Sequence, residues 1–155
     1  ARFRNLPFVT ERLMRVDSIW VNPVEWAGTM PGMNWATVTG QAPWTLRDHA
    51  TGEETHAIAR RFRRGDMLRL RLQGVRETLH AMQHPIHLHG QRFLVLAVNG
   101  VPSENPVWKD TVLVPAGGAV DLLVEMSNPG RWMLHCHIAE HLQAGMMMTI
   151  TVEDP

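Results

Sequence analysis

The chain has 155 residues, of which 45% are hydrophobic and 19% are charged, as is usual for one soluble globular domain. Its basic and acidic residues balance to a formal net charge of zero, so neither nucleic acid nor an anionic membrane is expected as a partner. No apolar run approaches the ~20 residues of a membrane span, and the first residues lack the apolar stretch of a signal peptide. The single cysteine excludes a disulfide within the chain.

Short alternating segments between Gly- and Pro-rich turns predict an all-β fold. We expect residues 1–12 to be a linker or an arm leading into one domain over residues 13–155. The clearest strand is "DMLRLRLQG" at 66–74, where leucine and arginine alternate. Further strands are expected at 92–98, 110–115, 119–126, 131–137 and 146–154, with one or two helical turns at 138–145. Many short strands of this kind favour a β-sandwich or barrel.

Metal-binding residue types are concentrated in two short windows. "HPIHLHG" occupies residues 84–90, and "HCHIAEHLQAGMM" occupies residues 135–147. Together they hold six of the nine histidines and the only cysteine. Such a concentration suggests a chemical role rather than packing alone.

Strand alternation divides these side chains between two faces, because successive residues of a strand point to opposite sides. In "RWMLHCH", Cys136 shares the apolar face, which should point into the core, while His135 and His137 point outward. In the first window, His84 points inward with its apolar neighbours, and His87 and His89 point outward.

Two metal sites follow from this division. The inward site combines His84, Cys136 and His141 with a more distant Met146, the ligand set of a blue-copper electron-transfer centre. The outward site is all imidazole and consists of His87, His89, His135 and His137. Because Cys136 lies between two outward histidines, the backbone provides a short bonded route from one site to the other.

Other functions fit the residues less well. A zinc site would need four ligands in tetrahedral closure, and the windows lack a Cys-x-x-Cys pair and contain too many imidazoles for one ion. A cysteine-histidine nucleophile would need an exposed, reactive thiol, whereas alternation buries Cys136. Met146 could also be a core residue, since methionine often fills cores and Met147 and Met148 lie beside it.

The two windows resemble the carboxy-terminal copper motifs of the multicopper oxidases, the family that includes the laccases. "MNWATVTGQ" (33–41), "WKDTVLVPAG" (108–117) and "NPGRWMLHCH" (128–137) resemble other parts of the last domain of that family. The resemblance runs from about residue 12 to the end. It implies a cupredoxin-like Greek-key β-sandwich or barrel.

The resemblance also implies a role for each residue of the two windows. His84, Cys136, His141 and Met146 would bind the type 1 copper, His87 the type 2 copper, and His89, His135 and His137 the type 3 pair. A reducing substrate, either a small molecule or a metal ion, would give single electrons at the exposed edge of His141. These would pass through Cys136 to His135 and His137, where the coppers reduce dioxygen to water. Glu140 is the first candidate for a proton donor and Asp110 a weaker one.

The chain departs from the family in having only half of the histidines of the oxygen-reducing cluster. The remaining histidines, His49, His56 and His80, are scattered and are expected in loops or at the surface. The resemblance therefore implies that an amino-terminal cupredoxin domain, in the same chain or another, supplies the other half, and that this chain alone is inactive. The histidine face should then be a domain interface, and family analogy implies an extracytoplasmic location. A stand-alone blue-copper electron carrier is the main alternative, and a copper-storage or assembly module is a third.

Overall fold

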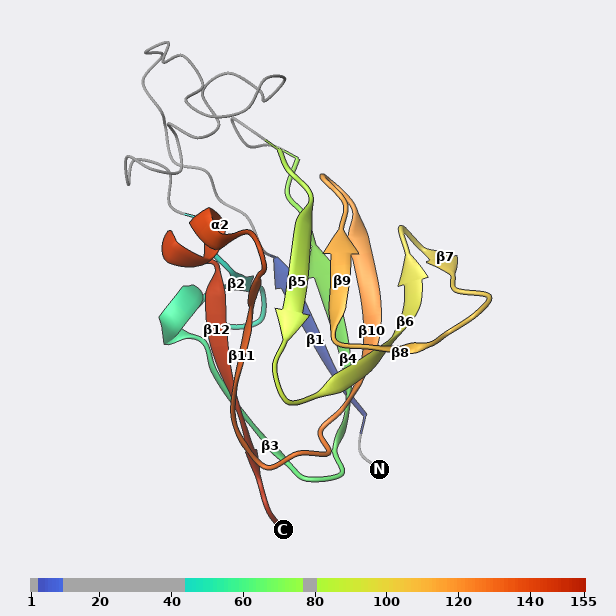
Figure 1. Cartoon of the computed structure of the whole chain (residues 1–155), viewed down its shortest axis with the longest axis vertical. Helices are drawn as coiled ribbons and strands as arrows, with labels where there is room; N and C mark the ends of the chain where they lie inside the picture. The colour runs from blue at the N-terminus through green and yellow to red at the C-terminus, as the bar shows by residue number, and fades with distance from the viewer. Residues whose placement is uncertain (1–2, 10–43, 77–80) are drawn as a thin grey trace.

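The computed structural model describes residues 44–76 and 81–155 in full and residues 3–9 by their backbone. Its strands form two sheets, which confirms the all-β sandwich expected from the alternating segments (Figure 1). The segment 33–41, which resembles the family, and His80 lie outside the described residues. No helix within the described ranges is long and apolar enough to cross a membrane.

The first sheet has seven strands, with the order β2-β1-β4-β10-β6-β7 and with β8 pairing β6 off this path. Its strands are β1 (Phe3–Val9), β2 (Arg47–Asp48), β4 (Met67–Gln73), β6 (Arg92–Val98), β7 (Val101–Pro102), β8 (Trp108–Lys109) and β10 (Ala119–Glu125). Strand β4 lies between β1 and β10, parallel to the former and antiparallel to the latter.

The second sheet has five strands, with the order β3-β12-β11-β5-β9. Its strands are β3 (Ala59–Arg63), β5 (His84–Leu88), β9 (Thr111–Val114), β11 (Gly130–Cys136) and β12 (Met147–Glu153). The two sequence windows therefore become neighbours, because β5 and β11 pair in register with His87 opposite His135 and Ile86 opposite Cys136. This register decides which histidines face one another.

The core lies between the two sheets and follows the alternation in the sequence. In β4, Leu68, Leu70 and Leu72 are buried, whereas the arginines between them are exposed. The same alternation holds in β5, where His84, Ile86 and Leu88 are buried. Burial of these apolar side chains supplies the main driving force for closing the sandwich.

The segment 1–12 contains a strand that alternation did not reveal. Residues Phe3–Val9 form β1, which pairs with β4 along its whole length and with β2 at one end. The backbone of an expected linker or arm thus adds to the first sheet, while the division into an arm and a domain at residue 12 stays a prediction.

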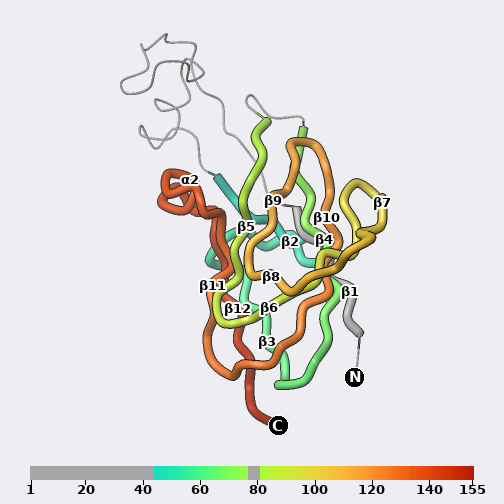
Figure 2. Tube along the Cα trace, turned by 45° about the vertical axis from the view of Figure 1, so that its right-hand side comes forward, coloured from blue at the N-terminus to red at the C-terminus, as the bar shows by residue number. Residues whose placement is uncertain are grey.

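Helix α2 (Ala139–Gln143) follows β11 and confirms the helical turns expected at 138–145. The backbone leaves the helix through Gly145, whose φ of +113° is a conformation that glycine adopts with little strain. The helix lies at the end of the sandwich opposite the carboxy-terminal residues in both ribbon and tube (Figures 1 and 2). It places His141 over the end of β11 where Cys136 lies.

An ion pair on the outer side of the first sheet predicts a dependence of stability on pH. Arg71 donates two hydrogen bonds to Asp121, of 2.8 and 2.7 Å, and these lower the pKa of the Asp121 carboxyl below its ordinary value of 3.8. The unfolded chain therefore binds this proton more tightly than the folded chain. We expect the free energy of unfolding to fall as the pH drops from about 5 through the ordinary range of the carboxyl towards its lower folded pKa. Urea titrations at pH 3 to 6 measure this slope, which Asp121→Asn should reduce and the exposed Asp154→Asn should leave close to wild type.

Candidate metal centre

Three side chains from separate elements meet inside the sandwich. His84 begins β5, Cys136 ends β11 and His141 lies in α2. The Cys136 Sγ lies 3.5 Å from His141 Nδ1 and 3.8 Å from His84 Nδ1, and the two Nδ1 atoms are 3.2 Å apart. All three residues are buried, so the donor atoms form a closed, water-poor cage.

The spacing and chemistry of this cage fit a metal ion. Bonds of about 2.0 to 2.3 Å from an ion to nitrogen and sulfur, as for zinc, separate ligand atoms by roughly 3 to 4 Å. The three donor atoms lie within 4.8 Å of one another, and they are the one such group of His, Cys, Asp and Glu in the described ranges. Two imidazoles and a thiolate suit copper in both oxidation states.

Met146 is tied to the cage by its backbone. Its N–H donates to the carbonyl of His141 at 2.9 Å, and its carbonyl accepts from the N–H of Cys136 at 3.1 Å. The side chain is fully buried. These bonds hold residues 136, 141 and 146 together, and the role of Met146 as an axial ligand stays a prediction.

The four outward histidines form a second cluster on the other side of β5 and β11. Neighbouring ring centroids are 4.6 to 5.8 Å apart for the pairs His87–His89, His87–His135, His87–His137, His89–His135 and His135–His137. The closest approach is 2.9 Å, between His89 Nε2 and His135 Nε2. These two nitrogens converge on one point, as two ligands of one ion would.

Hydrogen bonds to the protein fix the ring orientation of two histidines in this cluster, His87 and His135. His87 Nδ1 lies 3.0 Å from the carbonyl oxygen of Asp110 and 2.9 Å from the Thr111 hydroxyl, and His135 Nδ1 lies 2.7 Å from the carbonyl of Cys136. A carbonyl only accepts, so each Nδ1 carries the proton and each Nε2 has a free lone pair. This is the usual arrangement of a metal-binding histidine.

Burial and the repulsion of its neighbours favour the neutral form of His89. Desolvation, followed by the positive charge that His87, His135 and His137 would carry, lowers the pKa of His89 below 6.5. A neutral imidazole is the ligand form, so His89 is ready to bind a cation at neutral pH.

One expectation about exposure is corrected by the structure, and the direction of His135 agrees with the expectation. The expected exposed edge of His141 is absent, because the residue is 1% exposed and the Trp44 ring stacks on it. His135 points away from the core as expected but is only 6% exposed, because its ring packs among those of His87, His89 and His137. His137 is exposed at the rim of this cluster.

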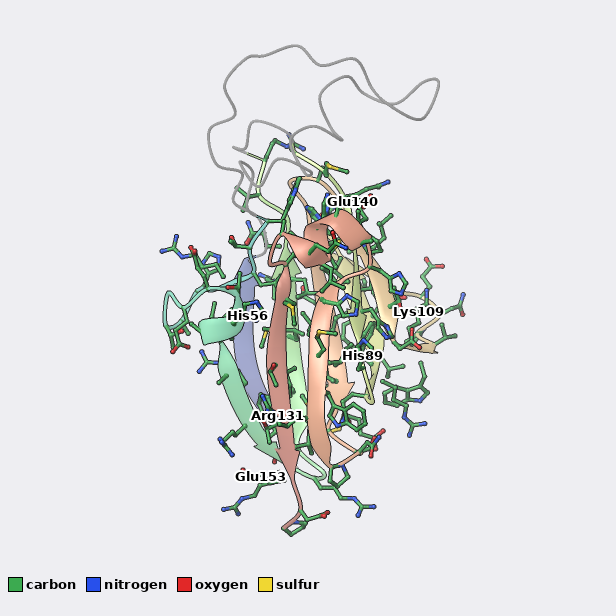
Figure 3. The ribbon with its side chains drawn as sticks, turned by 60° about the vertical axis from the view of Figure 1, so that its left-hand side comes forward. His56, His89, Lys109, Arg131, Glu140 and Glu153 are labelled. Atoms are coloured by element: carbon green, nitrogen blue, oxygen red, sulfur yellow. The ribbon has the colours of Figure 1, made fainter. Side chains whose placement is uncertain are left out.

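The two acidic candidates differ in their surroundings. Glu140 is exposed on α2, at one end of the molecule, whereas His89 lies further along the sheet (Figure 3). Asp110 adjoins the outward cluster, since its Oδ1 accepts a 2.7 Å hydrogen bond from Thr111 and lies 3.6 Å from His87 Nδ1. The structure thus favours Asp110 over Glu140 as the carboxyl beside the histidines. His49 and His56 are exposed, as expected.

Two residues beside these sites escaped sequence reasoning. Trp44 contacts His141 from a distant part of the chain, and no local sequence pattern predicts such a contact. Thr111 could have been found, because alternation in "DTVLVP" places it opposite the buried Val112 and Val114. Its partner could not, since the pairing of Thr111 with His87 depends on the register between β9 and β5.

A model of the family described as multicopper oxidase matches residues 25–155. The chain belongs to the multicopper oxidase family. Copper is the cofactor that this membership implies, and the His84, Cys136 and His141 cage suits it.

Individual multicopper oxidases and their relatives agree with this assignment. The chain is 44% identical over 80 residues to an oxidoreductase of Pestalotiopsis microspora, covering 46% of this chain and 13% of that protein. It is 35% identical over 97 residues to a laccase of Cryphonectria parasitica, covering 50% of this chain and 16% of the laccase. The chain therefore spans less than a fifth of the length of these relatives.

Solved structures confirm the cupredoxin fold of this multicopper oxidase domain. The blue copper oxidase from Nitrosomonas europaea superimposes with a TM-score of 0.60 and 26% identity, over 98% of this chain and 44% of the other. A multicopper oxidase called mgLAC gives a TM-score of 0.63 at 25% identity, over 96% of this chain and 43% of the other.

The hydroxyl of Thr111 offers a direct test of the outward cluster. Thr111→Val keeps the shape of the side chain but removes a hydrogen-bond partner of His87. We expect metal affinity at this cluster to fall by about 10- to 100-fold, as when the partners of ligating histidines are lost. The copper content of the purified protein after dialysis against graded chelator measures this loss. Thr149→Val, on β12 opposite Met133, is the matched control and should retain the wild-type copper content.

Proposed function

We propose that this chain is the electron-accepting, carboxy-terminal domain of a laccase-like copper oxidase that oxidises a reducing substrate and reduces dioxygen to water. The position of Cys136 carries the proposal. Its thiol is buried against His84 and His141, while the side chains on either side of it belong to the outward cluster. One residue thus belongs to the inner cage and is bonded through the backbone to two residues of the outer cluster.

The protein's own part in this reaction is to hold two sites at a fixed separation. Copper, when bound, supplies the one-electron redox chemistry. The inner cage excludes water, and two of its donors, Cys136 and His141, are tied together by backbone bonds through Met146. A rigid donor set needs little rearrangement when the charge of its ion changes, which favours rapid electron transfer.

Two of the outer histidines are held by hydrogen bonds in an orientation that suits a shared site. His87 and His135 present Nε2 because their Nδ1 atoms are bonded to the protein. His89 and His135 converge as a pair, whereas His137 is exposed. We propose that the remaining ligands come from an amino-terminal cupredoxin domain, in the same chain or another, and that this chain alone does not reduce dioxygen.

The surface beside the cluster supports such a docking. Leu113 of edge strand β9 is 48% exposed and has the same parity as Thr111, which contacts His87. Val107 and Trp108, which precede this strand, are also exposed. Large apolar side chains next to an incomplete histidine cluster suit a protein partner better than water. By family analogy, we also propose an extracytoplasmic location.

A stand-alone blue-copper electron carrier is the second candidate, because the inner cage is complete within this chain. The two candidates differ in metal content and in reaction. An oxidase in its complete form should bind four coppers, show an intense blue band and consume oxygen with a phenol or a reduced metal ion. A carrier should bind one copper and consume none. Blue colour without oxygen uptake, in a preparation that contains every domain, would reject the oxidase.

A further inference from the structure

The indole of Trp44 contacts both histidines of the inner cage. It stacks on His141 with ring centroids 3.9 Å apart and planes inclined by 22°. It meets His84 edge-on at 5.2 Å and 65°. Trp44 is itself only 1% exposed, so the three rings form one buried aromatic cluster. A single side chain therefore contacts both imidazoles that Cys136 also contacts.

The position of Trp44 is set by the backbone around it rather than by its polar atom. Within the described residues, the indole Nε1 has no hydrogen-bond partner. The Trp44 carbonyl oxygen passes within 3.4 Å of where a Cβ on Gly145 would lie. Two residues on, the Leu46 carbonyl accepts from the N–H of Thr55 at 2.8 Å, which anchors this segment. The ring faces of Trp44, and not its N–H, are thus the part the site uses.

A cage of histidines needs such a contact, because the torsion that turns an imidazole ring is broad and poorly defined by itself. A ring lying flat on His141 stops its rotation, and a ring edge against His84 restricts the second imidazole. The same contact keeps water from His141. Burial of the whole cage disfavours the more highly charged, oxidised state of a bound ion.

We propose that Trp44 is a positioning residue of the inner copper site, which aligns the imidazoles of His141 and His84 with Cys136 and shields them from water. This inference rests on the proposed copper function. It has a consequence for the reductant, which gives its electron across the indole rather than by touching His141. The contact also explains why His141 is buried rather than exposed at its edge.

Substitutions at position 44 of the full-length, copper-loaded protein test this role. Trp44→Phe keeps an aromatic ring face and removes the five-membered ring with its unpartnered N–H, so its blue band, copper hyperfine coupling and reduction potential should stay close to those of wild type. Trp44→Leu removes the ring face and admits water. Its blue band should shift and weaken, and at a fixed potential its oxidised-to-reduced ratio should rise about tenfold, which is a fall of about 59 mV. Phe93→Leu, at a buried aromatic residue of β6 in the first sheet, is the matched control and should keep the wild-type band and potential.

A measurement on the unsubstituted protein does not depend on the folding of any variant. In the reduced, diamagnetic protein, the His141 ring protons should resonate upfield, as protons above an indole face do. Ordinary His141 shifts would overturn the proposal, as would Trp44→Leu with the wild-type band and potential, or Trp44→Phe as altered as Trp44→Leu. A wild-type protein that takes up no copper would instead remove the proposed function, and this role with it.

Discussion

Cys136→Ser is expected to abolish both the blue band and oxygen uptake. A serine hydroxyl ionises far above the pKa of a thiol and provides a hard oxygen in place of a soft sulfur, so the cage loses the ligand that suits cuprous ion. The thiolate is also the link between the cage and the two histidines bonded to it. Absorption spectra, copper content and oxygen consumption of the full-length protein, loaded in parallel with wild type, measure the loss.

The control for this variant must separate chemistry from stability. Cys136 is fully buried among the donor atoms of the cage, so a substitution there can change stability as well as metal binding. Ile86→Val lies opposite Cys136 in the same strand pair and costs about 0.5 to 1.5 kcal/mol without touching a donor atom. It should keep the colour and the oxygen uptake. A blue, oxygen-consuming Cys136→Ser protein would refute the assignment of the inner site.

Gly90→Ala is expected to lower the free energy of unfolding by about 2 to 5 kcal/mol. This range adds the cost of a left-handed backbone at a residue with a side chain to the cost of overpacking the core. Gly90 has a φ of +65°, and a Cβ there would lie 2.2 to 2.4 Å from three ring atoms of Trp132. The indole cannot easily withdraw, because its Nε1–H donates a 2.8 Å hydrogen bond to the Asn128 carbonyl. Since Gly90 directly follows His89, the strain should also disturb the outward cluster. Urea unfolding measures the loss of stability, and metal titration measures the disturbance of the outward cluster.

Gly100→Ala separates the two parts of this effect. Gly100 has a similar φ of +80°, but nothing lies within 4 Å of where its Cβ would be. This variant should cost only the backbone strain, about 1 to 2 kcal/mol. The excess loss in Gly90→Ala then measures the collision with Trp132. Equal losses in the two variants would mean that the indole moves aside at little cost.

Local periodicity was enough to predict several of the longer strands, although not how they pair. The strand β4 was predicted from leucine alternating with arginine, and its leucines are buried as expected. The opposed directions of Cys136 and its neighbours followed from the same rule, because a strand has a side-chain period of two whatever it packs against. The division into an inner and an outer group of side chains was therefore present in the sequence.

Contacts between distant segments could not be predicted from the sequence. The stacking of Trp44 on His141 joins residues that are far apart in the chain, and the local sequence around neither residue indicates its partner. The burial of His141 was missed for this reason, and so was Thr111 as a partner of His87, which depends on strand register.

By itself, the sequence determined the chemistry of this protein: its fold class, the donor residues and the face of the strand to which each belongs. These properties depend on residue types and on short spacings along the backbone. The tertiary structure alone decided which donor atoms converge, which ring covers His141 and which carboxyl adjoins the outward histidines. Those properties depend on how the two sheets close and in what register their strands pair, which the packing of the whole core selects.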